Sequence, residues 1–308
     1  MALRPAAADA RSRGRAFFGL VLGFALLLGA PAHAAPLAHP VVVRTPLADG
    51  LWRASSYPVE GKHPLLVGVR RLNGSPAYVA WIDHTAIRLA LYPGLQEPPV
   101  ASPRGSAEVP PGERWRLLAT FNGGFKSVAG AGGFLVNGRV DEPLQKGFGT
   151  LVEYRDGRLA ILDWQGRTAP GMLVLARQNL PPLVWNGRPT ARTSQNWLWG
   201  TTLGGGAAVW RTAVGVTQQG DLVYAAADRQ TASSLAGLMV QLGAVRAIEL
   251  DINPEWPSFI SYGRRGGRDP VKLIPNPQQS AYRYLTPDNR DFFAVYTRAG
   301  GTALVPFR

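Results

Sequence analysis

Short stretches of β-forming residues, each bounded by turn residues, dominate the chain from Leu65 onward. Their β-branched and aromatic residues favour strands, and the Gly, Pro, Asn and Asp between them favour turns. The chain supplies these breaks in quantity, with 36 Gly and 26 Pro among its 308 residues. Strands are predicted at 65–70, 77–82, 86–92, 115–121, 150–155, 158–162, 207–216, 222–227, 246–250 and 291–297.

Local signals predict how some of these segments connect. Asp156-Gly157 separates two alternating stretches and is typical of a hairpin turn. One helix is predicted between Thr231 or Ser233 as the N-cap and Gly243 at the left-handed C-terminal position. The strand–helix–strand unit 222–250 predicts a crossover, which is compatible with a local parallel pair. We therefore predict an α+β fold: a mixed, largely antiparallel sheet with one or a few helices packed on it.

Residues 1–34 have the pattern of a signal peptide. Four Arg precede the apolar residues 16–30, and Ala32-His33-Ala34 fits an A-x-A cleavage site. An uncleaved anchor is the alternative, but an apolar run of about 15 residues is shorter than the ~20 that span a bilayer. We expect export to the periplasm or the medium, with no membrane span after cleavage, an extended lead-in segment at 35–63, and a single domain at 64–308.

Composition excludes several kinds of site. The chain has no Cys, so disulfides, thiolate metal sites and cysteine nucleophiles are ruled out. Its four His all lie in the first third, and no zinc, nucleophile-elbow or phosphate-loop motif is present. The net charge of +13 would become +10 once a leader carrying four Arg and one Asp is removed. This charge is spread thinly, and because no basic helix or RNA-binding motif accompanies it, no nucleic-acid partner is expected.

Glu249 and Asp251 are the strongest candidates for acid–base chemistry. They follow one another with a single residue between them at the end of a predicted strand, so both side chains project from the same face. A pair of carboxylates can divide the acid and base roles of a glycosidase. The alternative is a solvated acidic strand end, which the spacing alone does not exclude.

Two further features could bind an anion. In Asn122-Gly123-Gly124 the glycines would let a ligand approach the backbone N–H groups, and the Asn amide could hold an oxygen. Arg211 lies within an otherwise apolar strand, where a guanidinium can grip a phosphate in bidentate fashion. Taken singly, these are equally consistent with a plain glycine turn and an edge-strand arginine.

The order of these features along the chain resembles that of the phosphodiester glycosidase family, over about residues 115–260. Residues 211–216 (RTAVGV) and 241–251 (QLGAVRAIELD) resemble two of its motifs. The resemblance implies an exported enzyme that cleaves a sugar–phosphate diester at the sugar, on an α+β fold. It also implies that Asn122, Arg211 and Asp251 belong to the site. From the shared strand face, we expect Glu249 to divide the catalytic acid and base or nucleophile roles with Asp251.

The loop after Asp251 departs from the family, which has a glycine-rich segment there. Residues 252–258 (INPEWPS) replace it, so Trp256 could stack on a sugar and Glu255 could supply a carboxylate. Gly123, Gly124 and Lys126 complete the expected substrate-binding set. We expect a glycosidase acting on a sugar-phosphodiester or other anionic glycan of the cell envelope, or alternatively a non-catalytic binder of such a polymer. No cofactor is required, and a calcium ion near Asp251 is left open without a supporting ligand loop.

Overall fold

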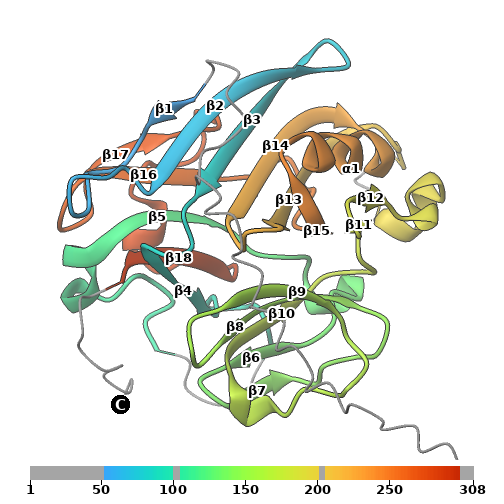
Figure 1. The fold of residues 1–308 in the computed structure, drawn as a ribbon, viewed down its shortest axis with the longest axis horizontal. Helices are drawn as coiled ribbons and strands as arrows, with labels where there is room; N and C mark the ends of the chain where they lie inside the picture. Colours follow the sequence, from blue (N-terminus) through green and yellow to red (C-terminus); the bar gives the residue numbers. More distant parts are fainter. Residues whose placement is uncertain (1–51, 100–104, 201–204, 299–308) are drawn as a thin grey trace, which may run out of the picture. The chain divides into compact units, whose positions relative to one another are not determined.

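The computed structural model describes residues 52–99, 105–200 and 205–298. The predicted signal peptide, residues 1–34, and the first part of the lead-in segment lie outside the described residues. From residue 52 onward the chain is organised as three β-sheets (Figure 1). None of the described helices is long and apolar enough to cross a membrane.

The largest sheet has eight strands, in the spatial order β1-β2-β3-β14-β13-β15-β11-β12. Its strands are β1 (Arg53–Ala54), β2 (Leu65–Leu72), β3 (Ser75–Ile82), β14 (Leu222–Gln230), β13 (Val209–Thr217), β15 (Ala244–Glu249), β11 (Val184–Trp185) and β12 (Arg188–Pro189).

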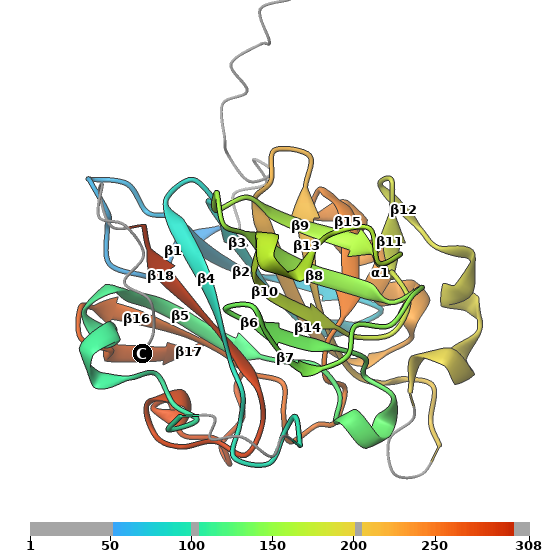
Figure 2. The same cartoon turned by 90° about the horizontal axis from the view of Figure 1, so that it is seen from below.

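Two five-stranded sheets complete the fold (Figure 1 and Figure 2). The first contains β7 (Arg139–Glu142), β6 (Phe134–Val136), β10 (Leu173–Gln178), β8 (Gly149–Tyr154) and β9 (Leu159–Asp163). The second contains β17 (Arg268–Lys272), β16 (Phe259–Arg264), β5 (Leu117–Asn122), β18 (Phe292–Thr297) and β4 (Ile87–Tyr92). Short 3₁₀ turns lie at Pro111–Arg116, Ser127–Ala129, Pro170–Met172, Ala191–Ser194, Asn196–Trp199 and Arg283–Leu285.

The predicted strands, their largely antiparallel pairing and the scarcity of helix are confirmed, but the parallel component expected of a mixed sheet is not. Every strand pair among the described residues is antiparallel. The strands are also divided among three sheets, because strand patterning marks which segments are extended without marking which segments they pair with.

Helix α1 (Ala232–Gln241) is the one α-helix in the described part of the chain, and it connects β14 to β15. Thr231 caps it: its side chain accepts the Ser234 N–H while the Ser234 hydroxyl accepts the Thr231 N–H. Gly243 follows with a φ of +87°, as the sequence predicted. The expected crossover is present, but β14 and β15 both pair with β13, which separates them. No parallel pair therefore forms in this unit.

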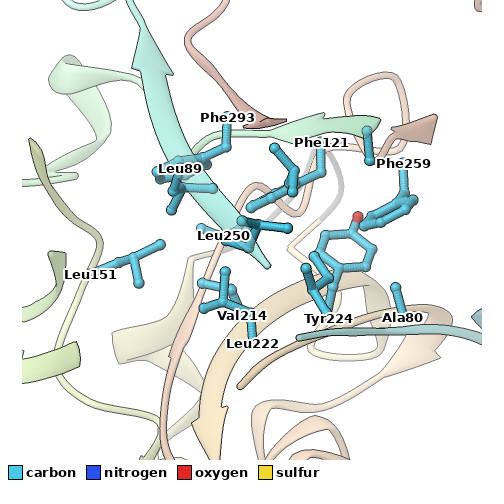
Figure 3. Packing of buried hydrophobic residues seen from close by; sticks show 14 of the residues in the cluster. Ala80, Leu89, Phe121, Leu151, Val214, Leu222, Tyr224, Leu250, Phe259 and Phe293 are labelled. Carbon is cyan, nitrogen blue, oxygen red and sulfur yellow. The ribbon is translucent and has the colours of Figure 1, made fainter. Parts of the chain in front are cut away.

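The main apolar core draws residues from all three sheets. At its centre Phe121 of β5, Tyr224 of β14 and Phe259 of β16 pack against one another, with ring centroids 5.1–6.0 Å apart (Figure 3). Aromatic rings bury large apolar areas and make favourable contacts at such separations. This cluster fixes the end of β5 against the large sheet. A second core lies between that sheet and α1.

The end of β5 is closely surrounded. After Asn122 the chain continues through Gly123 and Gly124, and a Cβ on Gly123 would collide with the carboxylate of Asp291. At Gly124 a Cβ would lie 3.0 Å from Nη2 of Arg177. Because these glycines have no side chain, Asp291 and Arg177 can lie close to the backbone. The sequence had suggested that a ligand would make this close approach.

Candidate active site

Three buried arginine–carboxylate pairs lie around the end of β5. Each joins an arginine to a carboxylate from another segment, and all six side chains are at most 7% exposed. Such pairs are costly to desolvate and persist only with good geometry and additional hydrogen bonds. The three pairs are Arg211–Glu249, Arg177–Asp291 and Arg290–Asp251.

Arg211 and Glu249 form the most deeply buried of these pairs. Nη1 of Arg211 lies 2.5 Å from Oε1 of Glu249, and both side chains are fully buried. The same guanidinium donates to three backbone carbonyls, those of Gln230, Trp199 and Ala207, at 2.9–3.0 Å. The phosphate-clamp role suggested for Arg211 and substrate contact by Glu249 do not fit this placement, because neither side chain reaches solvent. Their pair ties β13 to β15.

Asn122 is also engaged internally. Its amide nitrogen donates to Oγ1 of Thr212 and to the Gly123 carbonyl, and its oxygen accepts from the hydroxyl of Tyr224 and the N–H of Ser258. Gly123 donates its N–H to the Asp291 carbonyl at 3.0 Å. Asn122 is 3% exposed. These groups form the floor of the site and do not face a ligand directly.

Asp251 is placed beside Arg290, two residues after β15 ends. Oδ2 of Asp251 accepts from Nη2 of Arg290 at 2.6 Å, and its Oδ1 accepts the N–H of Asn253 at 2.9 Å. The same Nη2 donates to the Gly124 carbonyl. Nε of Arg290 is buried and has no hydrogen-bond partner among the described residues. A cation with an unused donor therefore lies next to a carboxylate.

The loop after Asp251 is held by consecutive side-chain-to-backbone bonds. The Asp251 carboxylate caps Asn253, and the Asn253 amide oxygen then accepts the N–H of Glu255 at 3.0 Å. Pro254 and Pro257 restrict the backbone further. Since Asx turns and prolines both limit the accessible backbone conformations, this loop is stiff.

Trp256 belongs to this loop; its side chain is partly buried and lies against two arginines. The Cζ atoms of Arg290 and Arg283 lie 5.5 and 5.2 Å from the centroid of its ring, within the range of cation–π contacts. Glu255 and Lys126 are both exposed. The structure thus brings Asp251 and Trp256 together through Arg290, and leaves Glu255 and Lys126 at the surface.

Burial raises the pKa of both predicted acids. It raises the pKa of Glu249 to about 7 against the lowering effect of Arg211, and the pKa of Asp251 to about 6 against that of Arg290. In each case desolvation disfavours the charged form, and the neighbouring guanidinium recovers part of the cost. A pKa of about 6 places Asp251 in the range in which a carboxyl group can exchange protons near neutral pH.

Sequence reasoning missed the other charged members of the site. Arg290 and Asp291 belong to a short charged run, 288–291, that directly precedes the apolar strand β18. Arg177 lies near the end of the largely apolar β10, and its Nη2 donates to the Phe125 carbonyl. A charge inside an apolar strand is the one signal that could have marked Arg177, as it marked Arg211.

Potential metal ligands occur in one group among the described residues. Asp83, His84 and Asp221 each offer an atom within 4.8 Å of the others. Oδ1 of Asp221 already accepts both the backbone N–H and Nδ1 of His84. At Asp251 an arginine and a backbone N–H take up the carboxylate. Calcium prefers a cage of several oxygen ligands with no positively charged side chain beside it, and neither place provides such a cage.

We predict that Arg211→Lys destabilises the fold. One ammonium cannot replace the fork that bonds Glu249 and three carbonyls, so buried acceptors lose their donors. The free energy of unfolding in urea should fall by at least ~2 kcal/mol. The control is Arg158→Lys, at a side chain 65% exposed, which should change it by less than about 0.5 kcal/mol. Equal effects of the two substitutions would contradict the internal role of Arg211.

The chain is distantly similar to proteins of known structure. The catalytic domain of zebrafish N-acetylglucosamine-1-phosphodiester alpha-N-acetylglucosaminidase, auto-inhibited by its pro-peptide, is 15% identical with a TM-score of 0.47. That match covers 80% of this chain and 89% of the zebrafish chain. A hypothetical protein from Synechocystis is 13% identical with a TM-score of 0.42, over 80% of this chain and 65% of the other. No curated protein sequence matches the chain.

The sequence comparison that covers part of the site is with a family. Residues 116–251 match the family model of the phosphodiester glycosidases. The matched segment begins just before β5 and ends on Asp251, and it contains Asn122, Arg211 and Glu249. The match favours a glycosidase-type function and a carbohydrate-type substrate. The segment 116–251, which forms the floor of the site and supplies its carboxylate, is the part of the chain that resembles the phosphodiester glycosidase family.

Proposed function

We propose that this protein is an exported glycosidase that hydrolyses a sugar–phosphodiester linkage of an anionic envelope glycan. Asp251 acts as the base, Arg290 binds the phosphate, and Trp256 faces the sugar. One observation carries the proposal. A buried arginine with an unused Nε donor contacts a carboxylate whose pKa is about 6, at the end of the family-matched segment.

Arg290, rather than Arg211, has a donor to offer a phosphate oxygen. Four hydrogen bonds take up the Arg211 guanidinium, whereas Nε of Arg290 has no partner among the described residues. A guanidinium matches the geometry of a phosphate group well. Trp256 lies against the same guanidinium, so a sugar attached to that phosphate would come close to an aromatic ring.

A single carboxylate is sufficient for this reaction. Water adds to the anomeric carbon, the bond from that carbon to the phosphate oxygen breaks, and its electron pair stays on the phosphate. The proton released by the water goes to Asp251. A leaving phosphate is weakly basic, and Arg290 would stabilise the charge that develops on it, so no second carboxyl is needed to protonate it. Glu249 then acts through Arg211 as a structural group.

Access to the carboxylate requires a local movement. The Asp251 side chain is only 7% exposed, and Trp256 is the large side chain of its loop that contacts Arg290. We propose that substrate displaces the Trp256 ring and takes its place beside the guanidinium. Rotation of one side chain between rotamers requires no movement of the stiff loop backbone.

Two observations support the location and the polymer. Residues 1–34 have the pattern of an export signal. The chain is also basic, which favours association with an anionic polymer. The low exposure of Asp251 favours a second candidate function, a binder of anionic polysaccharide without turnover. The two candidates differ in one measurable respect, the release of sugar.

Turnover should depend on Asp251. With synthetic hexose 1-phosphate methyl diesters of both anomeric configurations, Asp251→Asn should lower kcat by at least ~10²-fold, because the amide cannot accept the proton. The variant keeps an oxygen that can accept the Asn253 N–H, but it leaves the buried Arg290 guanidinium without its counter-charge. We therefore expect a loss of about 3–5 kcal/mol in stability, and kcat is measured at a temperature at which circular dichroism shows the variant to be folded.

The matched control for this substitution is Asp163→Asn, at the exposed end of β9, which should retain full activity. If the parent releases no sugar from either anomer but binds the diesters, the binder function replaces the enzymatic one.

The pH profile should report the pKa of Asp251. A base must be ionised, so kcat/KM should rise with pH through about 6, where the raised pKa of Asp251 lies. Arg290 lowers that pKa, so Arg290→Gln should move the rising limb to higher pH, whereas Arg290→Lys should leave it nearer the parent position. If the rising limb of the pH profile lies at the same pH in the parent, Arg290→Gln and Arg290→Lys, Asp251 is excluded as the titrating base.

A further inference from the structure

A groove lies on the other side of the loop that follows Asp251. It has a volume of about 380 Å³, within the range of about 300–1,000 Å³ that is usual for small-molecule sites. One wall is formed by Pro254, Glu255 and Pro257, and the opposite wall by residues 274–278, with Trp210 of β13 also lining the groove.

The lining is suited to a sugar ring. The rings of Trp210 and of several prolines present apolar C–H and π surfaces, while Glu255, Asn276 and Gln278 add a carboxylate and two amides. Small-molecule sites combine apolar walls with a few polar groups that fix the orientation of the ligand. A pyranose has both an apolar C–H face and a rim of hydroxyls, so it can use both kinds of group.

The charge of the groove differs from that of the Asp251 site. Among the described residues no Arg, Lys or His lines it, and the carboxylate of Glu255 is the one ionisable side chain in that lining. By contrast, Arg290 and Arg283 both lie against Trp256. An anionic group is therefore disfavoured in the groove, and an uncharged sugar unit is favoured.

Both walls are held in place by hydrogen bonds. Nζ of Lys272 donates to the carbonyls of Asn276 and Gln279, which fixes the wall at 274–278. Nε2 of Gln279 donates in turn to the Glu255 carbonyl and joins the two walls. A site built in advance of binding loses less entropy when the ligand arrives.

The loop that follows Asp251 separates the groove from the site and contributes residues to both. Trp256 contacts Arg290, while its neighbours Glu255 and Pro257 line the groove. A glycan that crosses this loop can therefore place one unit at Trp256 and the next unit in the groove. We propose that the groove binds the uncharged sugar unit next to the cleaved linkage, so that the enzyme prefers an oligosaccharide to a single sugar; this rests on the proposed function.

The kinetic test compares two substrates that differ only in length. The methyl phosphodiester of a neutral trisaccharide should have a kcat/KM at least ~10-fold above that of the monosaccharide diester, a factor that corresponds to about 1.4 kcal/mol. Gln278→Arg places bulk and charge in the groove, and it should bring this ratio close to 1 through KM of the longer substrate. A parent ratio near 1, or a ratio unchanged in Gln278→Arg, overturns the proposal.

A binding test separates this proposal from the proposed function. Neutral trisaccharides of glucose, galactose and N-acetylglucosamine, without phosphate, are titrated into the full chain, and the indole N–H of Trp210 is followed by NMR, assigned with Trp210→Phe. A shift of that signal that is lost in Gln278→Arg and kept in Asp251→Asn supports the groove even if no diester is hydrolysed. Hydrolysis of the diester without any shift at Trp210 supports the proposed glycosidase function and contradicts sugar binding in the groove. Inorganic phosphate should not produce the shift.

Discussion

The burial of two arginine–carboxylate pairs against one short backbone segment, beside a third pair between β13 and β15, is the constraint on which the rest of the structure depends. Residues 123–125 follow β5, and their carbonyls accept from Arg290, Arg177 and the N–H of Asp251. Removing one member of such a buried pair leaves an uncompensated charge, at a cost of about 3–5 kcal/mol. The glycines are needed because charged side chains approach this backbone closely.

These pairs also connect the three sheets. Arg290, just before β18, reaches Asp251, just after β15, and Arg177 of β10 reaches Asp291, which directly precedes β18. The aromatic cluster centred on Phe121 closes the same region from the apolar side (Figure 3). Asp251 is thus positioned by contacts that extend through the whole described domain. A rigid floor of this kind is what a catalytic carboxylate needs in order to hold its orientation.

Local features of the sequence predicted local structure well. The Asp156-Gly157 hairpin and the Thr231 cap depend on neighbouring residues alone, and both are confirmed. Asp251 could be selected as a candidate because its family motif is contiguous. Sheet membership and the partner of each charge depend instead on segments far apart in the chain. Arg290 reaches Asp251 across 39 positions, and no spacing rule could have paired them or shown that Arg211 is fully buried and makes four internal hydrogen bonds.

The central claim is that Asp251 and Arg290 direct cleavage to the bond between the anomeric carbon and oxygen, leaving the phosphorus untouched. Hydrolysis of a hexose 1-phosphate methyl diester in ¹⁸O-labelled water tests this directly, because the released methyl phosphate can be examined by ³¹P NMR. Attack at the anomeric carbon leaves the phosphate without ¹⁸O, and its signal should show no isotope shift. A methyl phosphate that has gained ¹⁸O would place the attack at phosphorus and contradict the account.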